Sequence, residues 1–327
     1  MWHRYQRSAQ ALMGAILLAG GYAGTAGAEE AYPSRMVRIV VPFAAGGSTD
    51  LLARQVANTL SRELKQSFVV ENRPGGSGDI GAALVARARD GGYTLLFTTT
   101  NLTANAAQPV APPYDPVKDF TPVTMVAFAP MLLTVSPNNP AKTVPALIEG
   151  IRSKPHQYNF SSSGVGGAPH LAGVLLSRQA GLDMVHVPYN GAVPALTDVA
   201  SGNVQLSFTT YVSAQPLLSA HRLRVMAVAG ARRLPALPDV PTLAESGVPG
   251  VEVGTMFGLL GPAGMPPERV QRLHAALRDQ GGTGGFRQAI EAMGADVVLN
   301  TPEQYSAYIR TDVARWKTLL KQVGDIQ

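Results

Sequence analysis

The chain has 327 residues, with 27 lysines and arginines against 22 acidic residues, and it contains no cysteine. The lack of cysteine excludes disulfides, a thiolate nucleophile and attachment of lipid to a thiol. The formal net charge of +5 is spread along the chain, with no basic run longer than Arg232-Arg233, so no electrostatic footprint for nucleic acid is present. A chain of this size without disulfides must be held together by its own hydrophobic core.

The first 28 residues have the pattern of a removable export signal. Arg4 and Arg7 make the start basic, residues 9–20 are apolar, and Ala26-Gly27-Ala28 supply small residues for cleavage. The apolar run is shorter than the ~20 residues that a membrane-spanning helix needs. We therefore expect a mature protein that begins at Glu29 and is located in the periplasm.

A strand, a glycine loop and a helix start follow one another early in the mature chain. Residues 37–41 are β-branched and apolar apart from Arg38, Pro42 ends the run, and Leu52, Val56 and Leu60 repeat on one helical face. The loop between them would point backbone N–H groups and the positive end of a helix dipole into a crevice, with Ser48 as the N-cap. The pattern suits an anion site without a cationic side chain. It also suits a tight connection whose glycines only permit positive φ.

A second glycine loop matches the dinucleotide-binding pattern G-x-G-x-x-G at residues 76–81. Its context argues against a dinucleotide, because the motif does not directly follow the first strand and no acidic residue stands at the ribose-binding spacing of about 20 residues. We interpret it as a loop beside the first one, at the carboxyl edge of one parallel sheet, where ligands bind in open α/β folds.

The second half of the chain repeats this arrangement without repeating its sequence. Residues 101–122 are polar and dotted with proline, and are expected to form a surface excursion. The apolar residues 125–135 can cross from one domain to another, and residues 251–260 look like the return crossing. Strands expected between them, each alternating with a helix, are 158–160, 184–188, 204–208 and 223–228. This alternation predicts parallel sheets with right-handed connections.

Two more glycine-rich loops open helices in this second set, and no catalytic or metal-binding set accompanies them. Ser163, His170 and Asp198 could form a nucleophilic triad only if the fold brought them together, and the G-x-S-x-G elbow is absent. His170 is expected to cap its helix or to line the cleft. No two histidines have metal-ligand spacing. Four glycine-rich helix starts without catalytic groups predict a binder of small anions that needs no cofactor and no metal.

Three carboxylates stand in or near first helical turns, at Asp50, Asp79 and Asp198. A carboxylate there stabilises the positive end of the helix dipole. The sequence favours this structural role at least as much as contact with a ligand for each of the three.

The ordered set of motifs resembles, over nearly the full mature chain, the substrate-binding proteins of tripartite tricarboxylate transporters, called Bug-type receptors. The matching stretches are V-P-F-A-A-G-G-S-T-D-L-L-A-R at 41–54, V-E-N-R-P-G-G-S-G-D-I-G-A at 70–82, Y-D-P-V-K-D-F-T-P-V at 114–123, S-S-S-G-V-G-G-A-P-H-L at 161–171, H-V-P-Y-N-G-A-V-P-A-L-T-D at 186–198, D-V-P-T-L-A-E-S-G-V-P-G at 239–250 and G-P-A-G-M-P-P at 261–267. Each glycine loop alone is a weak signal, whereas the ordered set is specific.

The resemblance implies an α/β, two-domain periplasmic binding protein of the type II, or Venus-flytrap, kind. Each domain would be a mainly parallel sheet flanked by helices, and two strands would cross between them. Domain 1 would comprise residues 29–129 and 254–327, and domain 2 residues 130–253. The implied function is that of a monomeric receptor, not an enzyme, which captures a small organic carboxylate and delivers it to two integral-membrane transporter subunits.

By position, the ligand contacts of the family fall on the four glycine-rich loops. They correspond to Phe43, Ala45, Gly46, Gly47, Ser48, Thr49, Asp50, Gly76, Ser77, Gly78, Asp79, Ser161, Ser162, Ser163, Gly164, Gly166, His170, Tyr189, Asn190, Gly191 and Ala192. The family usually has tryptophan at the position of Met256, near a crossing strand, where the change would affect the cleft wall or hinge. It also usually has Asp-Gly-Tyr-Thr where this chain has Gly91-Gly92-Tyr93-Thr94, a turn variation expected to lie away from the ligand.

Two other functions are compatible with these sequence features. An exported α/β hydrolase could use one of the loop serines, and a co-receptor of a two-component signalling system could share the binding fold. Because backbone N–H groups recognise any carboxylate, the loops do not choose among dicarboxylates, amino acids and aromatic acids.

Overall fold

The computed structural model describes residues 32–154, 156–281 and 284–323. The chain divides into two compact units at Ser34, and all the helices and strands named below belong to the second unit, Arg35–Gln327. The expected export signal and the expected start at Glu29 lie outside the described residues. Within those residues, no helix is both long and apolar enough to cross a membrane.

The first sub-sheet starts with three parallel strands. β1 (Val37–Val41) lies between β2 (Phe68–Asn72) and β3 (Thr94–Thr99) and is parallel to both. β9 (Gly254–Pro262) then pairs antiparallel with β3, and β4 (Phe120–Val135) pairs antiparallel with β9. Every residue of β3 is buried, which explains its nearly continuous apolar and threonine-rich sequence.

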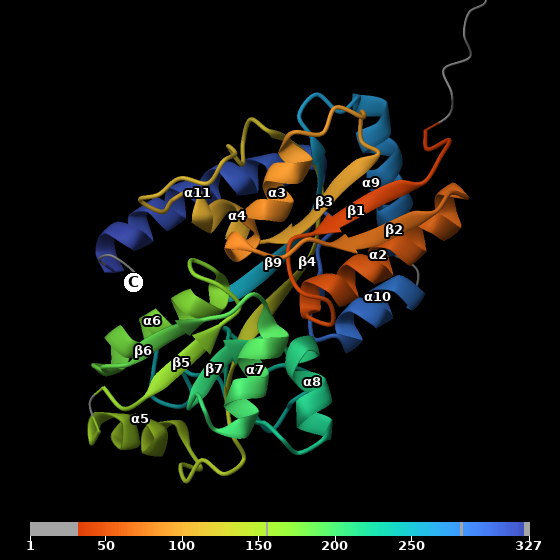
Figure 1. Ribbon diagram of the computed structural model, residues 1–327. Coiled ribbons are helices and arrows are strands. Elements are labelled where there is room, and N and C mark those ends of the chain that lie inside the picture. Colours follow the sequence, from red (N-terminus) through yellow and green to blue (C-terminus); the bar gives the residue numbers. More distant parts are fainter. Residues whose placement is uncertain (1–31, 155, 282–283, 324–327) are drawn as a thin grey trace, which may run out of the picture. The chain divides into compact units, whose positions relative to one another are not determined.

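Helices from both ends of the chain accompany this sub-sheet (Figure 1). They are α2 (Ser48–Leu64), the 3-10 turn η1 (Gly76–Gly78), α3 (Asp79–Ala86), α4 (Asn101–Asn105), α9 (Pro267–Gly281), α10 (Gly284–Ala292) and α11 (Pro302–Val323), with the short strand β10 (Asp296–Val297) on β4. The predicted stripe of α2 is confirmed, because Leu52, Val56 and Leu60 are fully buried.

Two expectations for this part of the chain are wrong in detail. α2 begins at Ser48, and its N-cap is Gly47, whose extended backbone has no side chain to cap the helix. The expected surface excursion from residue 101 instead opens with the buried helix α4. Its polar side chains are buried because Asn101 and Asn105 both donate hydrogen bonds to the carbonyl of Ser77.

The second sub-sheet also contains three parallel strands. β5 (Asn159–Ser162) lies between β6 (Val185–Pro188) and β7 (Leu206–Thr209). The C-terminal part of β4 pairs antiparallel with β7 on one side and with β8 (Arg224–Ala229) on the other. The helices of this part are α5 (Val144–Arg152), α6 (Ala168–Ala180), α7 (Ala192–Ser201) and α8 (Tyr211–Ser219).

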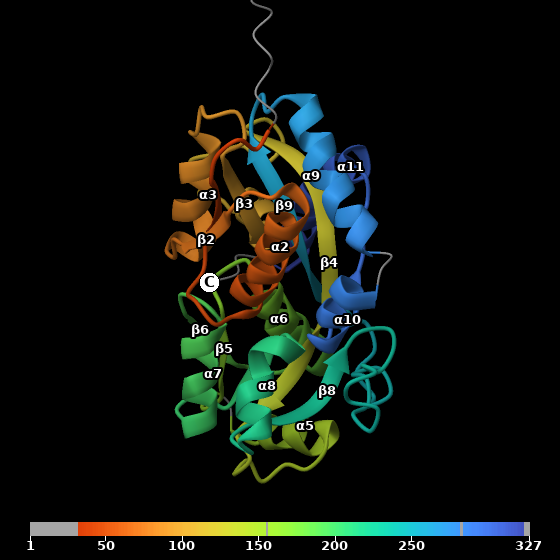
Figure 2. The ribbon, with the colours of Figure 1, turned by 90° about the vertical axis from the view of Figure 1, so that its right-hand side faces the viewer.

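Two segments connect the sub-sheets, as the sequence predicts. β4 pairs with β9 through its first part and with β7 and β8 through its last part, and Figure 2 shows it running from one set of strands into the other. The return segment crosses beside it, because Met131 N donates to Val253 O and Val253 N donates to Ala229 O. The fold is therefore a two-domain α/β fold of the periplasmic binding protein type with two crossing strands. The domain limits given above stay a prediction.

Candidate functional site

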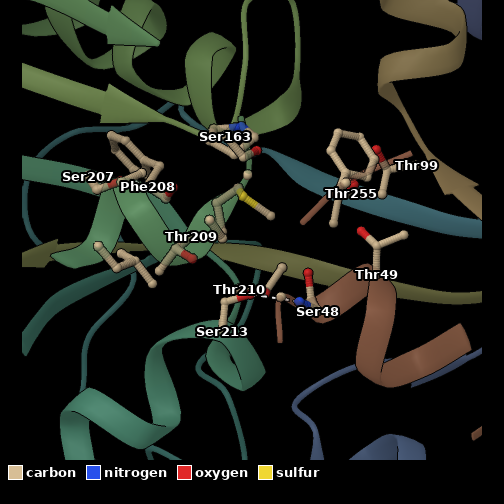
Figure 3. Close-up of a pocket in the computed structure, with 18 of the residues that line it drawn as sticks. Ser48, Thr49, Thr99, Ser163, Ser207, Phe208, Thr209, Thr210, Ser213 and Thr255 are labelled. Atoms are coloured by element: carbon tan, nitrogen blue, oxygen red, sulfur yellow. Dashed lines mark hydrogen bonds between the residues drawn. The ribbon is translucent and has the colours of Figure 1, made fainter. Parts of the chain in front are cut away.

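A pocket of about 560 Å³, including the part open to solvent, is lined by loops of both sub-sheets (Figure 3). From the first sub-sheet and the crossing strands it is lined by Phe43, Ala44, Gly47, Ser48, Thr49, Thr99, Asn101, Met131 and Thr255. From the second it is lined by Ser163, Pro169, Gly191, Ala192, Ala195, Leu196, Ser207, Phe208, Thr209, Thr210 and Ser213. None of these side chains is ionisable.

Two helix starts from different sub-sheets face this pocket. α2 contributes Gly47, Ser48 and Thr49, and α7 contributes Gly191 and Ala192. Both N-caps are glycines, so neither helix is capped by the side chain of its own N-cap residue, and the first N–H groups of a helix have no partner within the helix. The pocket is thus bordered by N–H donors and by the positive ends of two helix dipoles, an arrangement that suits an anion.

The two sub-sheets touch at the edge of the pocket. The N–H of Ser48 donates to the Oγ of Ser213 at 3.0 Å, from the start of α2 to the first turn of α8. Ser213 also accepts a hydrogen bond from the hydroxyl of Thr210 at 3.1 Å. At the neighbouring α7 start, a Cβ added to Gly191 would lie 3.4 Å from the Cβ of Ala44. The structure therefore holds the two helix starts close together.

The hydroxyl groups of the pocket differ in their hydrogen-bond partners. Those of Thr99, Thr210, Thr255 and Ser207 are engaged with other protein atoms; that of Ser207, for example, donates to the carbonyl of Ser161 at 2.9 Å. In the described part of the chain, the Oγ1 of Thr209 is fully buried and has no hydrogen-bond partner. A buried hydroxyl without a partner is energetically costly, and this one belongs to a residue of the pocket wall.

Asp50 holds the first loop from behind. Its carboxylate accepts hydrogen bonds from the N–H of Gly46 at 3.0 Å, from Arg54 Nε at 3.0 Å and from Asn72 Nδ2 at 3.1 Å. Burial would raise the pKa of Asp50, but the hydrogen bonds from Arg54, Gly46 and Asn72 and the charge of Arg54 outweigh it and hold the pKa below its ordinary value. Asp50 does not line the pocket, and it positions the loop that does.

Asp79 holds the second loop in a similar way. Its carboxylate accepts from Asn105 Nδ2 at 2.7 Å and from the hydroxyl of Tyr114 at 2.8 Å. Burial, the charge of Asp79 and this hydrogen bond raise the pKa of Tyr114 far above its ordinary value. The second loop does not line the pocket. Instead it packs on the third glycine-rich loop, residues 161–169, where a Cβ added to Gly164 would lie 2.9 Å from Ser77 Oγ.

Asp198 supports the fourth glycine-rich loop, residues 189–191. It accepts a short hydrogen bond from the hydroxyl of Tyr189, and burial and this bond raise the pKa of Tyr189 to about 12. Asp50 and Asp79 lie in the first turns of α2 and α3, as expected, whereas Asp198 is the seventh residue of α7. All three carboxylates accept hydrogen bonds that help to hold the loops in place.

A buried polar cluster lies beneath the third loop. The Nδ1 of His170 accepts from the N–H of Gly166 at 3.1 Å, and the Nε2 of His186 is 2.7 Å from Ser162 Oγ. The two imidazole rings stack with their centroids 3.8 Å apart. Burial lowers the pKa of His170 to about 3 and that of His186 to about 4, so both rings are neutral at neutral pH.

The set Ser163, His170 and Asp198 is not assembled. The Nδ1 of His170 is taken by a backbone N–H, while Asp198 is engaged with Tyr189. The histidine that contacts a serine is His186, and that serine is Ser162. Within the described residues, no group of three or more His, Asp or Glu side chains could hold a metal ion.

The structure separates the predicted site residues into two groups. Those that line the pocket are Phe43, Gly47, Ser48, Thr49, Ser163, Gly191 and Ala192. Those that do not line it are Ala45, Gly46, Asp50, Gly76, Ser77, Gly78, Asp79, Ser161, Ser162, Gly164, Gly166, His170, Tyr189 and Asn190. Several of the second group support the loops that carry the first.

Sequence reasoning missed several pocket residues that the second sub-sheet and the crossing strands contribute. Thr209 is the last residue of β7, and Thr210 lies between β7 and α8, the same position that the glycine loops occupy after their strands. They carry no glycine, so the motif search passed over them. Met131 and Thr255 lie where the two crossing segments meet, and the crossing itself could have pointed to them. Met256, next to Thr255, is fully buried in the hydrophobic core of the first sub-sheet (the first core) and does not line the pocket.

Comparisons with known proteins agree with this geometry. The model of a family described as "Tripartite tricarboxylate transporter family receptor" matches residues 52–325. Protein BugT of Bordetella pertussis is 30% identical over 316 residues, which cover 96% of this chain and 97% of that protein.

Solved structures with bound carboxylates are similar as well. A protein from R. palustris solved with adipate is 36% identical, with a TM-score of 0.87, over 90% of this chain and 98% of that one. MatC from Rhodopseudomonas palustris with bound malate is 31% identical, with a TM-score of 0.83, over 88% of this chain and 100% of that one.

Proposed function

Because this chain belongs to the tripartite tricarboxylate transporter receptor family, a family of solute-binding receptors and not of enzymes, we propose that it captures a small organic carboxylate in the pocket between its sub-sheets. It then delivers this ligand to a membrane transporter with two integral-membrane subunits. The proposal places the mature receptor in the periplasm, as a monomer, after removal of residues 1–28.

The observation that carries the proposal is the pair of helix starts with glycine N-caps at the pocket. The α2 and α7 starts come from different sub-sheets, and neither pocket wall carries a lysine or arginine. A helix start contributes only ~0.3–1 kcal/mol toward a nearby anion, so two starts and their N–H hydrogen bonds must act together. Binding of the carboxylate would thus require both sub-sheets at once, which is what a receptor that closes on its ligand needs.

The test compares a carboxylate with its amide. The purified protein is screened by thermal unfolding against a panel of small organic acids, and the best acid is then compared with the matching amide. At about 100 times its dissociation constant the acid should add ~2.7 kcal/mol to stability and raise the melting temperature by several degrees. The amide should give almost no shift.

Replacement of Arg73 tests whether binding of the acid needs a cationic side chain. Arg73 flanks the second loop, half exposed and outside the pocket, so Arg73→Ala should leave the affinity for the acid unchanged. The amide stabilising as well as the acid, or loss of all binding in Arg73→Ala, would contradict the proposal. Delivery is tested separately: deletion of the gene should abolish uptake of the acid, and unchanged uptake would contradict a transport role.

A further inference from the structure

Two contacts between the sub-sheets differ in how they are built. The first, which we call the joint, brings α4 and α11 of the first sub-sheet, with Asn101, Ala104 and Trp316, onto the third loop and the hydrophobic core of the second sub-sheet. The second, which we call the gate, brings Ser48 at the start of α2 to Ser213 of α8. Figure 1 shows α4, α11 and α6 further to the left than α2 and α8.

The joint buries apolar side chains of the first sub-sheet in the core of the second. Ala104 of α4 and Trp316 of α11 are 0% and 1% exposed, and both belong to the same core as Phe160 and Leu171. Ala107, just after α4, packs against this core as well. Separation of the sub-sheets here would expose the tryptophan ring to water, which is unfavourable in proportion to the apolar area exposed.

A close polar contact adds to the joint. A Cβ added to Gly167 would lie 2.6 Å from Asn101 Oδ1. The φ of Gly167 is −75°, which any residue adopts, so it is the close approach of Asn101 that requires glycine here. The hydroxyl of Thr103 in α4 donates to the buried Asp312 carboxylate of α11 at 2.6 Å, so the two helices are joined to each other.

The gate is held by groups that water can replace. The N–H of Ser48 donates to Ser213 Oγ at 3.0 Å, and after separation both groups could hydrogen-bond to water instead. Beside this bond, the Cγ2 of Val193 would lie 3.7 Å from a Cβ added to Gly46, and Val193 is 42% exposed at the start of α7. Separation at the gate therefore costs less than separation at the joint.

Two further contacts of the second sub-sheet lie near the gate. A Cβ added to Gly294, after α10, would lie 2.6 Å from the Cβ of Tyr211 at the start of α8. Arg232 and Asp296 form an ion pair at 2.9 Å, and their side chains are 69% and 62% exposed, so the pair contributes little to stability. Tyr211 is only half-buried, so neither contact anchors α8 as Trp316 anchors α11.

We propose that the joint stays packed whether or not a ligand is bound, and that the pocket opens and takes up its ligand at the gate. The inference rests on the proposed function and adds the route of entry to it. The pocket residues Asn101 and Ser163, which lie on the joint side, would keep their positions relative to each other. The start of α2 would move away from the starts of α7 and α8.

The first experiment measures the exposure of Trp316 in solution. The chain has two tryptophans, and Trp2 lies in the expected export signal, so Trp316 is the sole tryptophan of a protein that begins at Glu29. Quenching of its fluorescence by acrylamide is measured with and without the acid that binds best in the thermal screen. We expect Trp316 to be quenched far less than free N-acetyltryptophanamide, and equally in both states.

A second reporter is placed at the gate. Val193 does not line the pocket, and Val193→Trp in a Trp316→Phe background gives a protein whose tryptophan is at the start of α7. Its quenching should be strong without ligand and should fall when the acid binds. Gln215→Trp, at an exposed position of α8, replaces this variant if calorimetry shows that Val193→Trp binds no acid. Equal quenching of the gate reporter in both states would contradict entry at the gate.

Gly167→Ala tests the joint without any ligand. The added methyl group would press on Asn101, so the melting temperature of the ligand-free protein should fall by several degrees. Gly285→Ala is the matched control, because Gly285 is exposed on α10 and no atom lies within 4 Å of a Cβ placed there. It should not lower the melting temperature. An unchanged melting temperature in ligand-free Gly167→Ala would contradict a permanent joint.

The outcomes separate this inference from the proposed function. If no acid of the panel binds, the proposed function fails, while the quenching of Trp316 and the melting of Gly167→Ala, which need no ligand, still decide whether the joint is permanent. If acids bind and binding protects a Trp316 that is strongly quenched in the free protein, the joint opens with the pocket. The inference then fails while the proposed function stands.

Discussion

Gly191 shows how much of the site depends on single backbone positions. Its φ of 125° is one that residues with a side chain rarely adopt, and a Cβ there would contact Ala44 of the facing loop. We therefore expect Gly191→Val to abolish binding of the carboxylate while the protein still folds. Calorimetry for affinity and circular dichroism for the fold are the measurements.

Gly202 is the matched control for this substitution. It caps the other end of α7 with a φ of 83°, and no atom lies within 4 Å of a Cβ placed there. Gly202→Val should therefore lower the melting temperature through backbone strain yet leave the affinity unchanged. Equal affinities in Gly191→Val and in the unaltered protein would show that the α7 start does not contact the ligand.

The stacked histidines predict a pH dependence of stability. His170 and His186 have pKa values near 3 and near 4 in the folded protein, below the ordinary value of 6.5, so the unfolded chain binds protons first as the pH falls. Their contribution is fully present above about pH 6.5 and is lost below it, by about 1.4 kcal/mol per pH unit for each histidine. Denaturant unfolding between about pH 7 and pH 5 should show this slope.

A double substitution tests the source of that slope. His170→Asn keeps an acceptor for the N–H of Gly166, and His186→Gln keeps a partner for Ser162. The double variant should be less stable at neutral pH and should have a nearly flat profile in the same range. A slope that survives the double substitution would assign the effect to other groups.

The sequence predicts loops better than it predicts contacts within them. A glycine after a strand marks a helix start, so the positions of Gly47 and Gly191 at the pocket were predictable. Which first-turn side chain faces the ligand depends on three-dimensional partners: Asp50 turns toward Arg54 and Asn72, which are four and 22 residues away in sequence. Thr209 carries no glycine or other local signal, because only the fold places it at the pocket.

At the scale of elements, α11 joins parts that lie far apart in sequence. Trp316 is buried in the hydrophobic core of the second sub-sheet, with Ala104 of α4 among its members, while Tyr305 and Ile309 on the same helix belong to the first core. The indole N–H donates to Asp312 at 3.1 Å, and Asp312 also accepts from Thr103 at 2.6 Å. One helix therefore contributes to both cores.

This arrangement predicts a large effect for one substitution. Trp316→Ala should destabilise the protein by about 3–5 kcal/mol, because it leaves a cavity and removes one partner of the buried Asp312 carboxylate. Trp316→Phe keeps most of the packing and loses only the donor, so it should cost clearly less. Chemical denaturation measures both. Equal losses in the two variants would show that the hydrogen bond, and not the packing, carries the effect.

The elements themselves were largely predictable from periodicity. The spacing of Tyr305, Ile309 and Trp316 predicts one buried helical face, and all three are buried. The start of α2 was misplaced by one residue, because Ser48 resembles an N-cap although the extended residue is Gly47. α4 was missed because its polar residues look exposed in sequence, whereas the fold buries them against the second loop.

At the scale of the whole molecule, the first sub-sheet is completed only by a strand from the last third of the chain. β9 lies between β3 and β4, pairing Leu96 with Leu260 and Met125 with Gly258. A chain that ends at Gly250 lacks this strand, so β3 would lack its antiparallel partner and the first part of β4 would lose a neighbour. We expect such a truncated chain to aggregate, because unpaired apolar strand edges recruit other chains.

Light scattering and hydrogen exchange measure this outcome. The truncated chain should form large particles, and the amides of residues 94–99 should exchange quickly. Protection of those amides in a monomeric truncated chain would mean that the first sub-sheet can form without β9.

Because β9 comes late in the sequence, the first sub-sheet can be completed only late in synthesis. A ribosome must translate well past the middle of the chain before β3 and β4 can be bridged, and pairings between residues so distant in sequence form slowly. The first sub-sheet thus stays open until most of the chain has been made. For a protein that we propose is exported, this delay is useful if export requires an unfolded chain, since the strand that completes the sheet leaves the ribosome after most of the chain has emerged.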